Sequence, residues 1–347
     1  MEFLFYDFLG KPVWMWLAFM GIVVVLLALD LGVLHRKQRE IGVGESLTLT
    51  AGYVALGVAF GGWVWWYMGE GAGLAYLTGF VVEKSLAMDN VFVIAMIFTF
   101  FAVPRGYQHR VLFWGILGVI VLRAIMIGLG AALVEQAGWV LYVFAAFLIF
   151  TGVKMWTMAD HSYDVGNSAA LKLLKKRMRV TESLHGSRFF VRGPDPKTGR
   201  VAWFATPLFL ALTMVEIVDL VFAVDSVPAI FAITTDPFIV YTSNIFAILG
   251  LRALYFALAA MVHRFAYLKQ ALAVLLIFIG GKIFVADALG LAKIPPPVSL
   301  SVTFAILTTG VLYSLWKTRG GDAGGRTLTG TGQLSCSGPC ARAATAS

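Results

Sequence analysis

The chain has 347 residues, of which 59% are hydrophobic and 13% are charged, and its formal net charge is +8. A soluble domain is nearer half apolar and a quarter charged, so this composition excludes an ordinary soluble protein and indicates an integral membrane protein. The basic excess does not indicate a nucleic-acid partner, because most of the lysines and arginines fall between apolar runs, where they set orientation in a membrane.

Nine apolar runs are long enough to cross a bilayer as helices, since a span needs about 20 residues. Their uniform apolarity argues against the short alternating strands of a β-barrel. The sequence therefore predicts an all-α polytopic membrane protein with about nine transmembrane helices. The runs lie near 13–34, 47–69, 75–101, 112–134, 137–158, 203–231, 238–262, 268–289 and 298–316.

Basic residues follow every second run, which places them on one side of a nine-span zigzag. The positive-inside rule then predicts an N-terminus outside and a C-terminus in the cytoplasm. The basic positions are the stretch 35–39, Arg105 and Arg110, the loop 159–202, the residues His263, Arg264 and Lys269, and the pair Lys317 and Arg319.

The runs group into six parts along the chain. The loop between the two halves is basic, and 169–179 within it has the pattern of a short amphipathic helix. The tail is rich in Gly, Thr, Ser and Ala, holds Cys336 and Cys340, and is expected to be disordered. The parts are 1–74 (helices 1 and 2), 75–158 (repeat 1), 159–202 (basic cytoplasmic loop), 203–290 (repeat 2), 291–318 (helix 9) and 319–347 (tail).

Two of the apolar runs carry acidic segments that repeat one pattern. Glu83 and Asp89 stand six positions apart in the first, and Asp219 and Asp225 have the same spacing in the second. Charge inside a membrane span is costly, so paired carboxylates there indicate a functional site. With the neighbouring polar residues, the candidate metal ligands are Glu83, Asp89, Asn90, Glu216, Asp219, Asp225 and Ser226.

The repetition extends beyond the acids. Each three-helix unit has acids on its first helix, an arginine on its second (Arg123 or Arg252) and a lysine on its third (Lys154 or Lys282). Because three is odd, adjacent copies run through the membrane in opposite directions. The sequence thus predicts two inverted three-helix repeats, an arrangement of secondary transporters whose sites lie near the midplane.

The six-residue spacing sets a geometric condition on any shared site. Positions six apart on an ideal helix lie about 240° around its axis, not on one face. Both acids of a segment reach one point only if the helix bends or unwinds, and Pro228 offers a means in the second segment. An all-oxygen ligand set suits a hard divalent cation such as Mn²⁺, Mg²⁺ or Ca²⁺.

The embedded basic residues need partners of their own. Arg123 and Arg252 are expected to pair with part of the acid set, in a charge-pair or gating role. Lys154 and Lys282 lie closer to helix ends, where they either share that role or snorkel to the surface. Asp30, at the end of the first run, is either a pathway residue or a partner for the basic residues after it.

The acidic segments resemble the two hallmark segments of the TerC integral membrane family. The matching stretches are Glu83-Lys-Ser-Leu-Ala-Met-Asp-Asn-Val-Phe-Val and Asp219-Leu-Val-Phe-Ala-Val-Asp-Ser-Val-Pro-Ala, and Asp30-Leu-Gly-Val-Leu-His-Arg-Lys resembles the first helix of the Alx-like branch. The resemblance covers about residues 13–317. It implies a manganese exporter of the bacterial inner membrane that uses the candidate acids for transport.

The leading hypothesis is therefore Mn²⁺ export by alternating access, with Mn²⁺ as cargo and no cofactor. The expected partners are the divalent ion, the lipid bilayer and counter-transported protons, since carboxyl groups must lose protons to bind metal. Two alternatives stay open: an exporter of a small amino-acid-like solute, and a non-transporting membrane subunit of a tellurite- or stress-resistance complex. An enzyme is not expected, because the sequence shows no nucleophile–base pair, Gly-rich phosphate loop or HExxH pattern.

Overall fold

The computed structural model describes residues 2–32, 42–157, 165–181, 183–194, 201–259, 268–290 and 294–324. The predicted basic positions 35–39, His263 and Arg264, and both cysteines, lie outside these ranges. The described chain is mostly helical. Its α-helices are α1 (Val13–Gly32), α2 (Val43–Met68), α3 (Glu70–Phe100), α4 (Arg105–Gln136), α5 (Val140–Thr157), α6 (Ala169–Arg177), α7 (Pro207–Phe231), α8 (Pro237–Leu249), α9 (Leu251–Ala259), α10 (Leu268–Ala288) and α11 (Pro296–Gly324).

Six helices are long and apolar enough to cross a membrane, namely α2, α4, α5, α7, α10 and α11. The pair α8 and α9, bent by 42° at a break, makes a seventh if it is counted as one span. The apolar part of α1, Val13–Leu29, is shorter, and α3 carries three charged residues in its middle. Over the described ranges, length and composition thus identify six or seven candidate spans, and the predicted count of nine is not confirmed.

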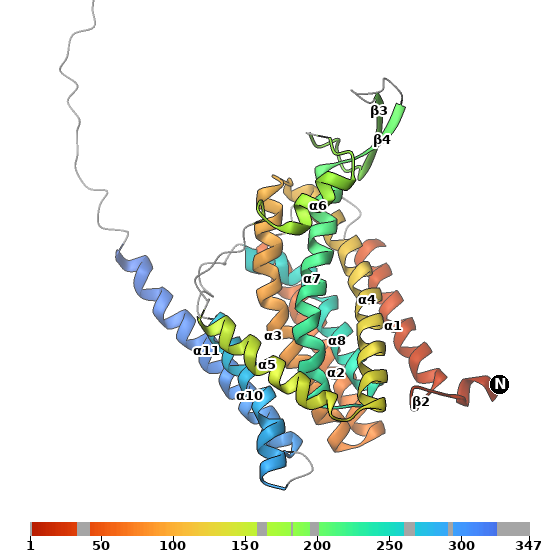
Figure 1. Cartoon of the computed structure of the whole chain (residues 1–347), viewed down its shortest axis with the longest axis vertical. Coiled ribbons are helices and arrows are strands. Elements are labelled where there is room, and N and C mark those ends of the chain that lie inside the picture. The colour runs from red at the N-terminus through yellow and green to blue at the C-terminus, as the bar shows by residue number, and fades with distance from the viewer. Residues whose placement is uncertain are drawn as a thin grey trace, which may run out of the picture.

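The helices form a bundle with a smaller group beside it (Figure 1). Helices α5, α10 and α11 pack together at one side, and α10 contacts both of the others. Helix α6 and a hairpin of β3 (Phe190–Pro194) and β4 (Val201–Ala205) lie at one end of the bundle. This hairpin and a second near the N-terminus, β1 (Asp7–Phe8) with β2 (Lys11–Pro12), were not predicted, and α11 continues to Gly324, past the expected start of the tail.

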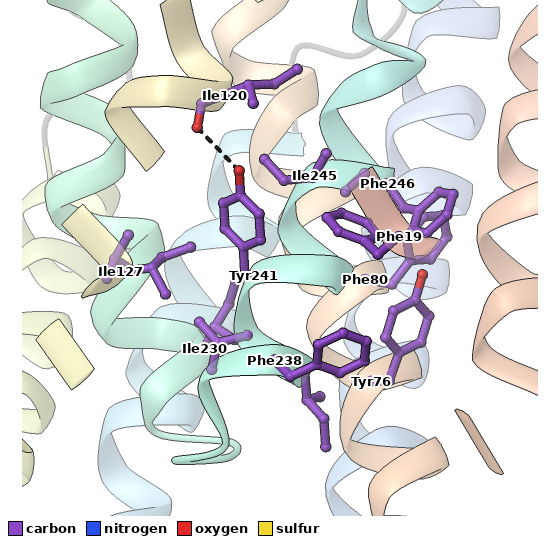
Figure 2. Packing of buried hydrophobic residues seen from close by; sticks show 14 of the residues in the cluster. Phe19, Tyr76, Phe80, Ile120, Ile127, Ile230, Phe238, Tyr241, Ile245 and Phe246 are labelled. Atoms are coloured by element: carbon purple, nitrogen blue, oxygen red, sulfur yellow. Dashed lines mark hydrogen bonds between the residues drawn. The ribbon is translucent and has the colours of Figure 1, made fainter. Parts of the chain in front are cut away.

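A cluster of buried aromatic and aliphatic side chains joins α1, α3, α4, α7 and α8 (Figure 2). On α4, Ile120 and Ile127 belong to this cluster, and the Tyr241 hydroxyl of α8 donates a hydrogen bond to the Ile120 carbonyl at 3.5 Å. Positions three and four residues apart share a helix face, so Arg123, which lies between the two isoleucines, also faces the interior. The apolar packing of α4 therefore fixes the direction of its buried arginine.

Two glycines allow α5 and α10 to approach closely. A Cβ at Gly152 would lie 2.8 Å from the carbonyl oxygen of Ala273, and one at Gly280 would lie 2.6 Å from the carbonyl oxygen of Ala145. Neither contact leaves room for a larger residue without backbone movement. Because the late part of each helix meets the early part of the other, α5 and α10 run antiparallel, and their contacts are reciprocal.

Candidate functional site

Arg123 lies in the interior of the bundle, with only 1% of its surface exposed. Its Nη1 donates hydrogen bonds to Glu83 Oε1 of α3 at 2.6 Å, to Ser226 Oγ of α7 at 2.7 Å and to Asn244 Oδ1 of α8 at 3.1 Å. One guanidinium nitrogen therefore gathers side chains from three other helices. A charge-assisted hydrogen bond of this kind is roughly twice as strong as a neutral one.

The other face of the same guanidinium meets Asp219 of α7. Nε and Nη2 each lie 3.5 Å from one carboxylate oxygen, a long two-pronged contact. Asn90 of α3 donates to Asp219 Oδ1 at 3.4 Å, and the Ser226 hydroxyl is hydrogen-bonded to Glu83. We call this set the Arg123 cluster. Its members are Glu83, Asn90, Arg123, Asp219, Ser226 and Asn244, all of them buried.

The second acid of each segment lies outside this cluster. Asp89 is buried on α3, and its electrostatic partner is Lys269 of α10. Asp225, half-buried on α7, is hydrogen-bonded to Thr151 of α5 and interacts with Lys154 of the same helix. Each second acid thus faces the third helix of the other three-helix unit.

Continuous helices explain why the acids of one segment separate. Helix α3 runs unbroken from Glu70 to Phe100, and α7 stays helical from Pro207 to Phe231 with Pro228 inside it. The bend or unwound turn that would bring both acids to one point is therefore absent from these two helices. With the six-residue spacing kept on an intact helix, the two carboxylates point to different neighbours.

Glu216 occupies a third position, one helical turn before Asp219, and the two carboxyl groups interact electrostatically. Its carboxylate lies against Gly118 of α4, so closely that a Cβ at that glycine would collide with it. The position of the Glu216 carboxylate thus depends on the absence of a side chain at Gly118. The sequence offered no reason to select Gly118 among the many glycines of the chain.

Several buried oxygen atoms near this centre have no hydrogen-bond partner. They are Glu83 Oε2, Asp89 Oδ1, Asn90 Oδ1 and Glu216 Oε2. Carboxylate and amide oxygens are the ligands that hard divalent cations prefer. However, within the ranges that the structure describes, no group of three or more His, Cys, Asp or Glu side chains is arranged to hold a metal ion.

The remaining basic residues take separate places. Arg252 is buried directly after the break between α8 and α9. Lys84 donates to the Ala247 carbonyl at 2.9 Å, close to the end of α8, where carbonyl groups lack helical partners. Lys282 of α10 donates to Ser299 of α11 at 3.2 Å.

Asp30 belongs to α1, but its side chain lies outside the described part of the structure.

Asn244 is the cluster member that sequence reasoning missed. It is fully buried on α8 and accepts a hydrogen bond from Arg123. The available signal was a carboxamide inside an apolar run, where an unpaired polar group is expensive. Neither acidic segment includes this residue, so the repeat pattern directed attention elsewhere.

The fold and the buried cluster define a multi-pass membrane protein whose helices enclose a hydrogen-bonded charge centre. The chain belongs to the TerC family of integral membrane proteins, whose family description, "Integral membrane protein TerC family", matches residues 68–321. This confirms the resemblance of the acidic segments. No solved structure matches the chain.

Curated relatives cover most of the chain. An "Uncharacterized membrane protein" of Rickettsia bellii is 46% identical over 300 residues, which is 86% of this chain and 96% of the relative. A Myxococcus xanthus membrane protein is 46% identical over 310 residues, 89% of this chain and 94% of its own. An Escherichia coli protein named "Putative membrane-bound redox modulator Alx" is 44% identical over 327 residues, 90% of this chain and 99% of its own.

Proposed function

We propose that this protein exports a divalent metal ion, Mn²⁺, across the bacterial inner membrane by alternating access. The observation that carries the proposal is the Arg123 cluster, in which two buried carboxylates from separate helices meet in the interior of a membrane bundle. Ionisable groups in such a place are characteristic of ion pathways. The protein acts as a transporter and not as an enzyme, with Mn²⁺ as cargo.

The inverted repeat is supported by reciprocal contacts between the two units. Asn90 of α3 bonds to Asp219 of α7, and the equivalent Ser226 of α7 bonds to Glu83 of α3. The contacts of the glycines in α5 and α10 are exchanged in the same way. Reciprocity of this kind is what a two-fold axis produces. Because α5 and α10 run antiparallel, a two-fold axis that relates them is roughly perpendicular to the helices. Inverted-repeat transporters have an axis of this orientation, in the plane of the membrane.

We propose that the cargo is held by oxygen atoms of both acidic segments. The unpartnered oxygens of Glu83, Asn90 and Glu216 supply part of the ligand set. Asp219 and Ser226 add oxygens from the cluster. Asp89 and Asp225 become ligands of the ion in other conformations of the transport cycle, in which the two three-helix units have moved relative to each other. Carboxyl groups must be deprotonated to bind a cation, so protons are the proposed counter-ion.

The proposed topology has nine spans, with the N-terminus outside and the C-terminus in the cytoplasm. Helices α1 and α3 are then counted as spans, and α8 with α9 as one bent span. Helix α6, with its basic last turn, lies at the cytoplasmic end, where the positive-inside rule places such segments.

Mn²⁺ uptake into proteoliposomes of known orientation, with and without a pH gradient, tests this function. Wild-type protein is expected to move Mn²⁺, and Glu83→Gln and Asp219→Asn are expected to abolish movement. Glu135→Gln is a matched control, because Glu135 is exposed at the end of α4. Equal Mn²⁺ flux in all four proteins, or no flux in the wild type, would contradict the proposal.

A second candidate cargo is a zwitterionic, amino-acid-like solute. A cavity of about 530 Å³, bordered by α3, α5, α7, α10 and α11, is lined by both Lys282 and Asp287, one group for a carboxylate and one for an ammonium. Amino acids added in excess to the same assay distinguish the two cargoes. Loss of flux in Lys282→Gln together with inhibition by an amino acid would favour the solute.

A further inference from the structure

The Arg123 cluster already contains a cation. The guanidinium contacts Glu83 at 2.6 Å and both oxygens of Asp219 at 3.5 Å, so it lies between the two carboxylates that the proposed cargo would need. One oxygen on each side stays available: Glu83 Oε2 and Asn90 Oδ1 are buried and unpartnered. The cluster is therefore a partly occupied cation site whose occupant is tethered to α4.

The charge of the cluster depends on where this occupant lies. With both carboxylates ionised, Glu83, Asp219 and Arg123 sum to one net negative charge, and a bound divalent ion would turn this into one net positive charge. If the guanidinium moves off the carboxylates, the ion meets both negative charges directly, and the ion and the two carboxylates together sum to zero. Because two cations between the same pair of carboxylates repel each other at short range, a divalent ion and the guanidinium compete for Glu83 and Asp219.

The cluster also offers the guanidinium neutral partners. Nη1 bonds to Ser226 at 2.7 Å and to Asn244 at 3.1 Å as well as to Glu83. An arginine that releases the carboxylates, and leaves the Ser226 oxygen to the ion, thus keeps Asn244 of α8 as a hydrogen-bond acceptor. Its movement away from the acids does not require exposure to lipid.

We propose that Arg123 is a tethered counter-ion that competes with the transported divalent cation for Glu83 and Asp219. Its return to the carboxylates displaces the ion and closes the cycle. This inference rests on the proposed transport function and adds to it a residue that determines both affinity and release.

Binding and transport by Arg123 variants test the competition. Mn²⁺ affinity is measured by equilibrium dialysis of purified full-length protein in detergent, and Mn²⁺ flux in proteoliposomes. Arg123→Gln is expected to bind Mn²⁺ at least about tenfold tighter, because a repelling unit charge a few ångströms away is removed. Its flux is expected to fall, because nothing displaces the ion. A residue that only supported the fold would change both quantities in the same direction.

Arg123→Lys keeps the test decisive if the glutamine variant does not fold, since it retains a buried positive charge. An ammonium cannot hold both oxygens of Asp219 as a guanidinium does, so it should compete less and tighten Mn²⁺ binding by a few-fold. Arg110→Gln is the control, because Arg110 is an exposed arginine of the same helix, bonded to Ser187. Its Mn²⁺ affinity should equal that of the wild type.

The outcomes separate this inference from the function on which it rests. If the wild type binds and moves Mn²⁺ but neither Arg123 variant binds it more tightly, the competition is wrong and the transport function stands. If no protein binds Mn²⁺, both proposals fail. Tighter binding with slower flux in the Arg123 variants, and neither change in Arg110→Gln, supports the competition.

Discussion

The first and second acids of the two segments have the same spacing and very different surroundings. Glu83 and Asp219, the first acids, meet at Arg123 in the bundle interior. Asp89 and Asp225, the second acids, face α10 and α5. The comparison teaches that an acidic segment is not a site by itself. The central cluster takes one acid from each segment, and the second acids, Asp89 and Asp225, each face the third helix of the other unit.

The first comparison to test is stability, where the largest difference is expected. Glu83→Leu leaves the guanidinium without its shortest ionic contact, and breaking a buried ion pair costs about 3–5 kcal/mol. Asp225→Leu removes a half-buried acid bonded to Thr151, and the expected loss is about 1 kcal/mol. Unfolding free energies in mixed micelles measure both. Equal losses would show that the two acids are equivalent.

Asn244 tests whether the cluster extends to α8. Asn244→Leu removes an acceptor of a charged hydrogen bond, with an expected loss of about 1.5–3 kcal/mol in the free energy of unfolding. Thr242→Val, in the same buried helix, removes neutral hydrogen bonds to the carbonyls of Phe238 and Ile239 and should cost less. The same micelle assay compares them. A larger loss of unfolding free energy in the threonine variant would show that the hydrogen bond between Arg123 and Asn244 does not stabilise the cluster.

Gly280 and Gly281, adjacent residues of α10, test the contact between α10 and α5, which are the third helices of the two units. Gly280→Ala forces a Cβ against the Ala145 carbonyl and is expected to cost about 1–3 kcal/mol. Gly281→Ala meets open space and is expected to be neutral or stabilising by up to about 1 kcal/mol. Thermal midpoints in detergent distinguish the two. Matching losses would mean that the close contact with α5 does not determine the cost of the substitution.

The smallest expected effect concerns Lys84, the neighbour of Glu83 that does not join the cluster. Lys84→Met removes the hydrogen bond to the Ala247 carbonyl and should lower the free energy of unfolding by about 0.5–1.5 kcal/mol. Lys317→Met, a change on an exposed part of α11, serves as the control. A loss as large as that of Glu83→Leu would indicate that Lys84 supports the central charges directly.

The sequence by itself determined the membrane class, the positions of the long helices and the family. Apolar runs and rare embedded charges are local properties, so they can be recognised without a fold. The structure departs from the sequence prediction where local signals fail, at the break between α8 and α9 and at the two hairpins. The nine spans stay a prediction, with six or seven candidates identified in the described chain.

The tertiary structure decided which of the predicted residues meet. A six-residue spacing fixes only the angle between two side chains on one helix, so it could exclude convergence but could not name the new partners of Asp89 and Asp225. Those partners depend on how neighbouring helices pack. Asn244 and Gly118 became visible for the same reason: each matters through a contact with a residue more than ninety positions away. The pairing of charges across helices is therefore a property of packing, whereas the supply of charges is a property of the sequence.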